Sequence, residues 1–497
     1  MAFRLRLLYF FFKNCYIRCP VYHLRDALRC LFIGSLLSIT ILSGCKFHHE
    51  VHSQTPQLNK QSLAESHVYN TQDLPKDHLA RFHDPQLMKL VRIALRDAPD
   101  IGSAKARMVA ANAVARGAYS NLWPSASLNS YAQKQRFSFK GTVPQPFNIL
   151  AFNQAKIADV ALNFNYELDL WGKNREIFAT RLSEAVAARL EVAQTKLILE
   201  SNIAQVYFAL QNNRIQQKLA AENVQLLREL EGIVLDRAKQ GIESDIPLKT
   251  AISNTQSARL SVQEYRRQEQ RSRHQLAVLL GKNPLNTHIE PLPFSYSPQQ
   301  LRLPENISTN VLAHRPDVLA SQALAEAAAH QINVARTEFY PDINLKGILA
   351  WQGFYFARFF NFSLKNSGGT AAVNLPLFDA GQRRANLNTQ QANFELAVNQ
   401  YNQTLLVALQ EVADEMATLA SLSQQIEEQQ RAVNTTQSNY RLFNARYQHG
   451  IIDYVQVLEL KQVLVQQKST LYTLQTQEKQ AAVALLAALG GEVLYDK

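Results

Sequence analysis

The chain repeats its own glycine pattern at a distance of 209 residues. Gly172 and Gly381 are separated by this offset, and so are Gly241 and Gly450. The same offset relates one further glycine pair and two arginine pairs, namely Gly281 and Gly490, Arg175 and Arg384, and Arg237 and Arg446. Several coincidences at one offset are improbable by chance, so the sequence predicts an internal tandem duplication.

Each half contains one very long stretch without helix breakers. Residues 173–240 hold no proline and a single glycine, Gly232, and residues 383–449 hold neither. As helices, stretches of about 67 residues would reach roughly 100 Å. This length exceeds that of globular helices and indicates coiled-coil or helical-barrel packing. After the turn glycines Gly241 and Gly450, second helices are expected at residues 248–280 and 451–489.

Strand patterns lie between the helical stretches. In residues 160–168 the apolar Val160, Leu162, Phe164, Tyr166 and Leu168 alternate with Ala161, Asn163, Asn165 and Glu167. Adding 209 gives a second alternating stretch, in which Ala371, Val373, Leu375 and Leu377 alternate with Ala372 and Asn374. Two earlier strands are expected after Pro124 and Pro341. Each half therefore predicts helix, strand, strand, long helix, turn and helix.

Aromatic residues stand at the strand ends: Trp123 and Tyr340 precede the two prolines, and Trp171 follows a strand. This placement is typical of the interfacial girdle of a membrane barrel. A soluble antiparallel sheet with one buried face is the alternative. Four strands cannot close a barrel, and lipid forbids open sheet edges. Three copies would supply 12 strands, so we expect an oligomer.

The N-terminus has the features of a lipoprotein leader. Arginines precede an apolar run over residues 31–42, which is too short for an ordinary membrane-spanning helix. Leu42-Ser43-Gly44-Cys45 follows and matches the bacterial lipobox. We expect a signal peptide over residues 1–44, a mature chain starting at Cys45 with a covalent diacylglycerol and N-acyl lipid, and a tether over residues 45–80. The alternative is an ordinary buried cysteine in a signal anchor.

Several functional classes are disfavoured by composition. All four cysteines lie at or before residue 45, which leaves the rest of the chain without a disulfide or a cysteine-bound metal. The net charge of +11 is partly due to the leader, so nucleic-acid binding is not expected. His48, His49 and His52 could bind a metal, but the tether interpretation is favoured. Walker, HExxH and GxSxG motifs are absent, so an enzyme and a cofactor are not expected.

Longer strings carry a specific family resemblance: FHDPQLMKLVRIAL from Phe82, NYELDLWGKNR from Asn165, HRPDV from His314, PLFDAGQRR from Pro376 and RYQHGIIDYVQVLE from Arg446. With these the chain resembles the outer membrane efflux protein family of the TolC/OprM type, in its RND efflux lipoprotein branch. The resemblance implies a mainly α protein with a membrane β-barrel. Its homotrimer would combine four strands per subunit into a 12-strand barrel and add a long periplasmic α-helical barrel.

The resemblance also implies location and partners. The protein would be lipid-anchored in the outer membrane, span it, and project into the periplasm. It would passively conduct drugs or other small solutes received from an inner-membrane RND pump and a periplasmic adaptor protein. On this basis residues 81–285 form the first efflux repeat, 286–304 a linker, 305–492 the second repeat, and 493–497 a tail.

Two kinds of site residue follow from the motifs. Gly172 and Gly381 would allow a sharp change of direction between strand and long helix, beside Asp169 and Trp171 in the first half and Phe378 and Asp379 in the second. In the family, acidic and bulky apolar residues close the periplasmic tip, and the matching positions are Asp453, Val455 and Glu459. The alternative is that these are ordinary solvated helix ends.

Two other functions stay open. A TolC-like exit duct could serve type I protein secretion, and a periplasmic coiled-coil scaffold could lack a pore. The lipobox and the HRPDV string favour the RND branch, whereas the alternating strands count against a scaffold.

Overall fold

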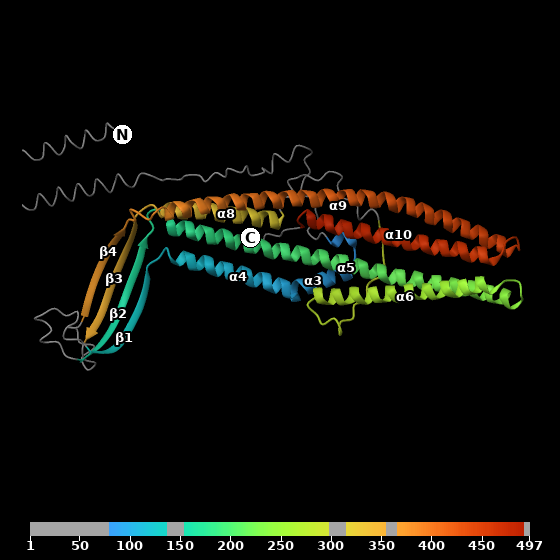
Figure 1. The fold of residues 1–497 in the computed structure, drawn as a ribbon, viewed down its shortest axis with the longest axis horizontal. Helices are drawn as coiled ribbons and strands as arrows, with labels where there is room; N and C mark the ends of the chain where they lie inside the picture. The colour runs from blue at the N-terminus through green and yellow to red at the C-terminus, as the bar shows by residue number, and fades with distance from the viewer. Residues whose placement is uncertain (1–78, 137–153, 298–314, 354–364, 492–497) are drawn as a thin grey trace, which may run out of the picture. The chain divides into compact units, whose positions relative to one another are not determined.

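The computed structural model describes residues 79–136, 154–297, 315–353 and 365–491. The elements in chain order are shown in Figure 1: η2 (Ala80–Phe82), α3 (Pro85–Asp97), α4 (Pro99–Ser120), β1 (Ser125–Arg136), β2 (Gln154–Leu168), α5 (Lys173–Lys239), α6 (Asp245–Leu279), α8 (Pro316–Thr337), β3 (Asp342–Gly353), β4 (Lys365–Asn374), α9 (Gln382–Gln448) and α10 (Tyr454–Ala488). Among the described residues, no helix has the length and apolarity needed to cross a membrane.

The helices confirm the internal duplication. The long helices α5 and α9 have 67 residues each, and α6 and α10 have 35 each. Adding 209 to both ends of α5 and α6 gives both ends of α9 and α10. The predicted start of the last helix at residue 451 was too early. Residues 451–453 still belong to the turn, because Asp453 caps α10 by accepting a hydrogen bond from the Val455 amide.

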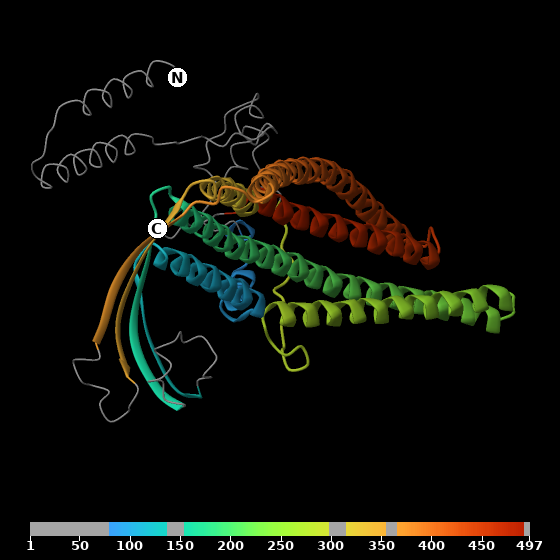
Figure 2. The same ribbon diagram turned by 60° about the vertical axis from the view of Figure 1, so that its left-hand side comes forward.

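The helices form two hairpins with shorter helices beside them. α5 packs along α6, and α9 along α10, as Figures 1 and 2 show. α4 contacts α5, while α8 contacts both α5 and α9. The order of contacts is therefore α4, α5, α8, α9, which leaves α4 and α9 as the outer members of the row.

The largest core lies where α3, α6 and α10 meet the middle of α5. Ile203, Tyr207 and Phe208 of α5 are fully buried there beside Leu87 of α3 and Leu276 of α6. Each such side chain contributes about 1.5–3 kcal/mol by leaving water. The Tyr207 hydroxyl also donates to Asp84, which caps α3. This core fixes the first hairpin against the N-terminal helices.

The chain that follows α6 is held across the helices by buried polar contacts. The Tyr296 hydroxyl donates to Glu478 of α10 at 2.5 Å. The adjacent Lys479 ammonium lies 4.2 Å from the Phe294 ring centre and 5.0 Å from that of Phe208. Burial lowers the pKa of Lys479 to about 8. These contacts connect α5, α10 and residues 294–296 at one level.

A buried arginine organises the start of α8. Arg315 donates to Asp317 at 2.7 Å, to the Ala488 carbonyl of α10 at 2.7 Å, and pairs with Glu411 of α9 at 2.8 Å. Pro316 occupies the first helical turn, where its missing N–H costs nothing. The HRPDV string therefore fastens α8 to the second hairpin.

The four strands form one antiparallel sheet in the order β1-β2-β3-β4. β1 and β4 are thus the edges. The predicted last strand over residues 371–377 had the wrong bounds, because β4 ends at Asn374 and Leu375 and Leu377 lie beyond it. Pro376 follows and has no N–H to continue the ladder.

Candidate functional site

The sheet has one apolar face that runs across all four strands. Directly opposed residues of an antiparallel pair point to the same side. The register places Leu162 between Leu128 and Leu349, and it places Leu345 between Tyr166 and Ala371. The apolar residues of this face are Ala126, Leu128, Val160, Leu162, Phe164, Tyr166, Ile343, Leu345, Leu349, Trp351, Ala371 and Val373. The same side also carries Ser130, Ser367, Lys134 and Lys365. The expected apolar residues from both halves therefore share one side, except Leu375 and Leu377, which lie beyond the end of β4.

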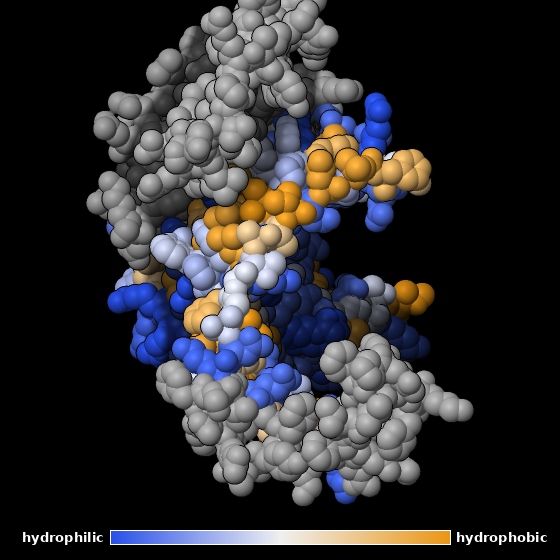
Figure 3. Space-filling model, turned by 90° about the vertical axis from the view of Figure 1, so that its left-hand side faces the viewer, coloured by the Kyte–Doolittle hydropathy of each residue, from blue (hydrophilic) through white to orange (hydrophobic). Residues whose placement is uncertain are grey.

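The opposite face is polar. It contains Ser125, Ser127, Asn129, Asn163, Asn165, Glu167, Asn344, Lys346, Thr370 and Asn374, with Ile157, Ile348, Ala161, Ala350 and Ala372 among its apolar exceptions. Large side chains of the apolar face are nevertheless exposed, among them Leu128, Phe164 and Val373. Figure 3, seen from the side that carries the sheet in Figure 1, shows exposed hydrophobic patches beside hydrophilic ones. The sheet can separate an apolar medium from a polar one.

Each long helix begins at a glycine in the left-handed region. Gly172 has φ 87° and Gly381 has φ 91°, a conformation that glycine adopts without steric cost. Before Gly172, the Asp169 carboxylate accepts from the backbone amides of Asn174 and Arg175 and pairs with the Arg175 guanidinium at 3.2 Å. The aspartate thus holds the chain while it turns from strand to helix.

The second junction also pairs an aspartate with an arginine. Asp379 lies one residue after, and Arg383 one residue before, the position that the 209-residue offset predicts. Asp379 accepts from the amides of Gly381 and Arg383 and pairs with the Arg383 side chain at 2.5 Å. The Arg383 contact lowers the pKa of Asp379. The sequence offset had matched Arg175 with Arg384, but Arg383 makes the equivalent ion pair.

Trp171 links two strand ends at the first junction. Its ring stacks on Tyr340 with centroids 5.0 Å apart, and its Nε1 donates to the Pro341 carbonyl at 2.8 Å. Phe378, the aromatic residue of the second junction, is almost fully exposed. The two junctions therefore differ in how their aromatic rings are covered within one chain.

The far ends of the two hairpins turn at matching glycines. Gly241 has φ 73° and Gly450 has φ 69°. The following amides bond back into the helices, Ile242 to the Arg237 carbonyl and Ile451 to the Arg446 carbonyl, both at 2.9 Å. This pattern of a left-handed glycine and a backward hydrogen bond ends a helix cleanly.

Asp453, predicted at the tip, connects the two hairpins. Its carboxylate accepts from the Val455 amide at 3.3 Å and forms an ion pair with Arg237, at the end of α5. The Arg237 guanidinium is the main reason that the pKa of Asp453 lies below its ordinary value. Arg237 also pairs with Glu243 at 3.5 Å. Asp453 is therefore neutralised locally and does not stand as a free carboxylate.

Further contacts extend this connection along α5 and α10. The Tyr454 hydroxyl donates to Glu229 at 3.2 Å, and its ring lies 4.8 Å from that of Tyr447. Two turns further along both helices, Lys461 pairs with Glu222 at 3.7 Å. Arg237, Tyr454 and Glu229 were not predicted as tip residues from the sequence. The repeated arginine before each turn glycine was the available signal for Arg237.

The other two predicted tip residues have separate positions. Val455 is half-buried at the start of α10, and Glu459 is exposed one turn later. A single chain cannot bring together a ring of such residues, so the gate assignment stays a prediction. Cys45 and the three nearby histidines lie outside the described residues.

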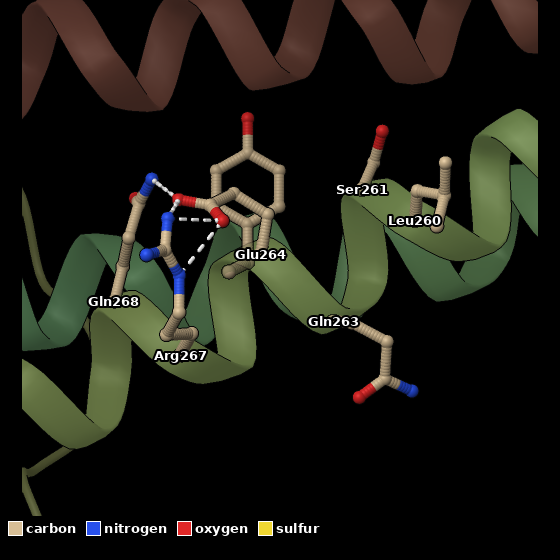
Figure 4. A pocket seen from close by; sticks show the side chains of 7 residues that line it. Leu260, Ser261, Gln263, Glu264, Arg267 and Gln268 are labelled. Carbon is tan, nitrogen blue, oxygen red and sulfur yellow. Dashed lines mark hydrogen bonds and ion pairs between the residues drawn. The ribbon is translucent and has the colours of Figure 1, made fainter.

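A surface hollow on α6 offers no comparable chemistry. Figure 4 shows Glu264 of this hollow between Arg267 and Gln268. Its carboxylate accepts from Arg267 Nε at 2.9 Å and Gln268 Nε2 at 2.8 Å. The carboxylate is satisfied within its own helix. Among the residues that the structure describes, no group of three or more His, Cys, Asp or Glu side chains could hold a metal ion.

Comparison with known proteins gives consistent similarities. The family described as "Outer membrane efflux protein" matches residues 90–282 and 307–491. The putative multidrug resistance outer membrane protein MdtQ of Escherichia coli K12 is 26% identical over 473 residues, covering 91% of this chain and 96% of MdtQ. The probable efflux pump outer membrane protein TtgC of Pseudomonas putida is 26% identical over 416 residues, covering 82% and 84%.

Solved structures share the fold. The outer membrane protein VceC of Vibrio cholerae superposes with a TM-score of 0.74 at 27% identity, covering 84% of this chain and 99% of that one. The CmeC outer membrane channel of Campylobacter jejuni superposes with a TM-score of 0.79 at 22% identity, covering 89% and 94%.

Proposed function

The chain belongs to the outer membrane efflux protein family, and from this we propose that it is the outer-membrane exit duct of a tripartite RND-type efflux system. It conducts drugs or other small solutes passively from an inner-membrane pump and periplasmic adaptor to the exterior. The names of MdtQ and TtgC, a multidrug resistance protein and an efflux pump component, favour small solutes over exported proteins. No catalytic step is proposed for this chain.

The observation that carries the proposal is the two-sided sheet. Its apolar side extends from Leu128 on β1 to Val373 on β4, and the charged Lys134 and Lys365 of that side lie only where β1 ends and where β4 begins. Its other side carries Asn163, Lys346 and Glu167. A membrane barrel needs apolar residues toward lipid and polar residues toward a water-filled lumen. A periplasmic scaffold without a pore would expose Phe164 to water on that side, which is unfavourable for a large apolar side chain.

We propose that three copies close the pore. The sheet has edges at β1 and β4, and an edge in lipid leaves several backbone groups without partners. Three copies give a closed barrel of 12 strands and extend the row α4, α5, α8, α9 into a ring of helices. Each wall is then incomplete in a single chain and complete in the homotrimer.

Lipidation and the gate complete the proposal. Cys45, behind the apolar leader, takes the diacylglycerol and N-acyl lipid and anchors the mature chain to the outer membrane. At the other end, Asp453, Val455 and Glu459 form rings around the trimer axis and close the resting periplasmic tip. Exposed Glu459 supports a charged mouth, and the Arg237 link to Asp453 supports a tip held shut within each subunit.

A deletion strain tests the function directly. Strains lacking the gene are grown against a panel of toxic small compounds, and uptake of a fluorescent efflux substrate is followed. Increased sensitivity and dye retention, both restored by the intact gene, are expected. Unchanged sensitivity together with loss of a secreted protein would instead identify a type I secretion duct.

A further inference from the structure

The two strand hairpins have the same internal geometry, and this determines how neighbouring copies should meet. Ser125 and Arg136, the ends of β1, become Asp342 and Gly353, the ends of β3, when 217 is added. The second strand of each hairpin leads into its long helix, for which the offset is 209. Ser125 of β1 pairs with Asn165 of β2. Adding 217 to Ser125 and 209 to Asn165 gives Asp342 and Asn374, and these two residues are paired in the structure. The first hairpin therefore maps onto the second pair by pair.

Between the hairpins, β2 pairs with β3. Leu162 lies opposite Leu349, and Tyr166 lies opposite Leu345. In a closed ring of identical chains, β4 takes the place of β2 and β1 of the next copy takes the place of β3. The internal β2–β3 contact is therefore a template for the contact between copies.

On this basis, which rests on the proposed trimeric channel, we infer that β4 pairs with β1 of a second copy in one defined register. The template pair is Leu162 of β2 and Leu349 of β3. Adding 209 to Leu162 gives Ala371, and subtracting 217 from Leu349 gives Ala132, so Ala371 lies opposite Ala132 of the second copy. The same shift places Val373 opposite Ser130 and Leu375 opposite Leu128. All of these residues lie on, or continue, the side of the sheet that carries the apolar face, and Ser130 is the one polar residue among them. The pairing therefore keeps this side continuous around the ring.

The exposure of the edge residues agrees with this seam. Every described residue of β4 is exposed, and Val373 has an exposed fraction of 66% and Leu128 of 69%. Their counterparts in the internal seam, Phe164 and Leu345, have 45% and 39%. The edges are more open because the strands that cover them belong to other copies.

The junction aromatics point to the same neighbour. Trp123-Pro124 precedes β1 as Tyr340-Pro341 precedes β3, and Tyr340 is covered by Trp171 within the chain. Trp123 is 61% exposed although it lies against Tyr119, with ring centres 6.4 Å apart. The two offsets take the stacked pair Trp171 and Tyr340 to Ala380 of one copy and Trp123 of the second. The start of β1 in the second copy therefore lies beside the second junction of the first copy.

The helices supply an independent observation. Within the chain, Ala187 of α5 packs in a cluster with Ala320 and Ala323 of α8. The same offsets take Ala187 to Leu396 of α9, and Ala323 to Ala106 of α4. Leu396 is 57% exposed, and Ala106 is exposed. These two surfaces lie on the outer helices of the row, where the second copy would join them.

Cysteine pairs test the register in the full-length trimer. Ala371→Cys with Ala132→Cys in one chain should, on mild oxidation, give linked dimers and then a covalent trimer on a non-reducing gel. The matched control is Ala371→Cys with Leu128→Cys, four residues further along the same face and thus about 13 Å out of register. Either cysteine alone should give no ladder. Leu162→Cys with Leu349→Cys reports the internal template and should link within one chain.

The outcomes separate the inference from the proposed function. A ladder from the Ala132 pair, absent from the Leu128 pair, supports the register. A protein that is trimeric by native mass measurement but links through the Leu128 pair, or through neither, overturns the register and leaves the channel assignment intact. A protein that is not trimeric in outer-membrane extracts overturns both.

Discussion

The guanidinium of Arg237 forms an ion pair with the carboxylate of Asp453 across the ends of the two helical hairpins. Arg237 lies in the last turn of α5 and Asp453 caps α10. The pair therefore joins elements that are separated by more than two hundred residues in sequence. Both side chains are partly exposed, so we expect the contact to position the tip and to contribute little to the stability of the whole fold.

Arg237→Gln should loosen the closed tip. Without the guanidinium, Asp453 keeps its capping bond to Val455 but loses its link to α5. Resting conductance in planar bilayers should rise, and cells should become more sensitive to vancomycin, which is too large for an ordinary closed duct. Lys239→Gln is the matched control, because exposed Lys239 pairs with Asp236 of its own helix. Equal conductance in the two variants would exclude the ion pair as a latch.

The latch should withstand moderate acid. The pKa of Asp453 is lowered by Arg237 and by the amide of Val455. A carboxylate with a depressed folded pKa keeps its contribution above the ordinary value of about 3.9 and loses it as the pH falls through the lower, folded value. Resting conductance should thus be flat between pH 7 and pH 5 and rise only below about pH 4. An increase centred near pH 6 would indicate a histidine and not Asp453.

The predicted rings at the tip can be tested by neutralisation. Asp453→Asn with Glu459→Gln should weaken cation preference and reduce block by trivalent cations, because a ring of carboxylates attracts cations. Glu459→Gln alone should account for most of the change in selectivity, since Asp453 is already paired. Val455→Ala should raise resting conductance by widening the apolar constriction. Wild-type values for conductance, selectivity and antibiotic sensitivity in all three variants would place the gate elsewhere.

Much of the fold follows from periodicity in the sequence. The 209-residue offset and the absence of breakers predicted α5 and α9 to within one residue at each end. Alternation over residues 160–168 found the apolar face of β2. The bounds of β4 were wrong because alternation continues past Asn374, whereas Pro376 stops the ladder.

The contacts of the candidate site were harder to predict from the sequence than the fold. Asp453 was found by motif position, but its partner Arg237 lies in the other half of the chain. A pair between distant residues depends on how the hairpins pack, and hydrophobic period does not encode that packing. The same limit applies to Tyr454 with Glu229, and to the register slip that pairs Asp379 with Arg383 and not with Arg384.

Lipidation of Cys45 is a prediction from the leader alone. The sulfur is expected to carry diacylglycerol, so a radioactive fatty acid should label the wild-type protein. Cys45→Ser removes the acceptor and should abolish labelling. Cys30→Ser, within the predicted leader, is the control and should leave labelling unchanged. A labelled Cys45→Ser protein would show that the lipid is attached at another residue.

The apolar face should be sensitive to charge and the polar face should not. Phe164 lies in the middle of the apolar face, opposite Ala126 and Gly347, and is exposed in the single chain. Arginine on the lipid side of a membrane barrel costs about 2–4 kcal/mol near the midplane. Phe164→Arg should therefore reduce the amount of trimer in the outer membrane. Asn163→Arg is the matched control, because Asn163 is one residue away on the opposite face, where a charged side chain can reach water in the lumen. Quantifying trimer in membrane extracts compares the two, and equal losses would mean that this sheet does not separate lipid from water.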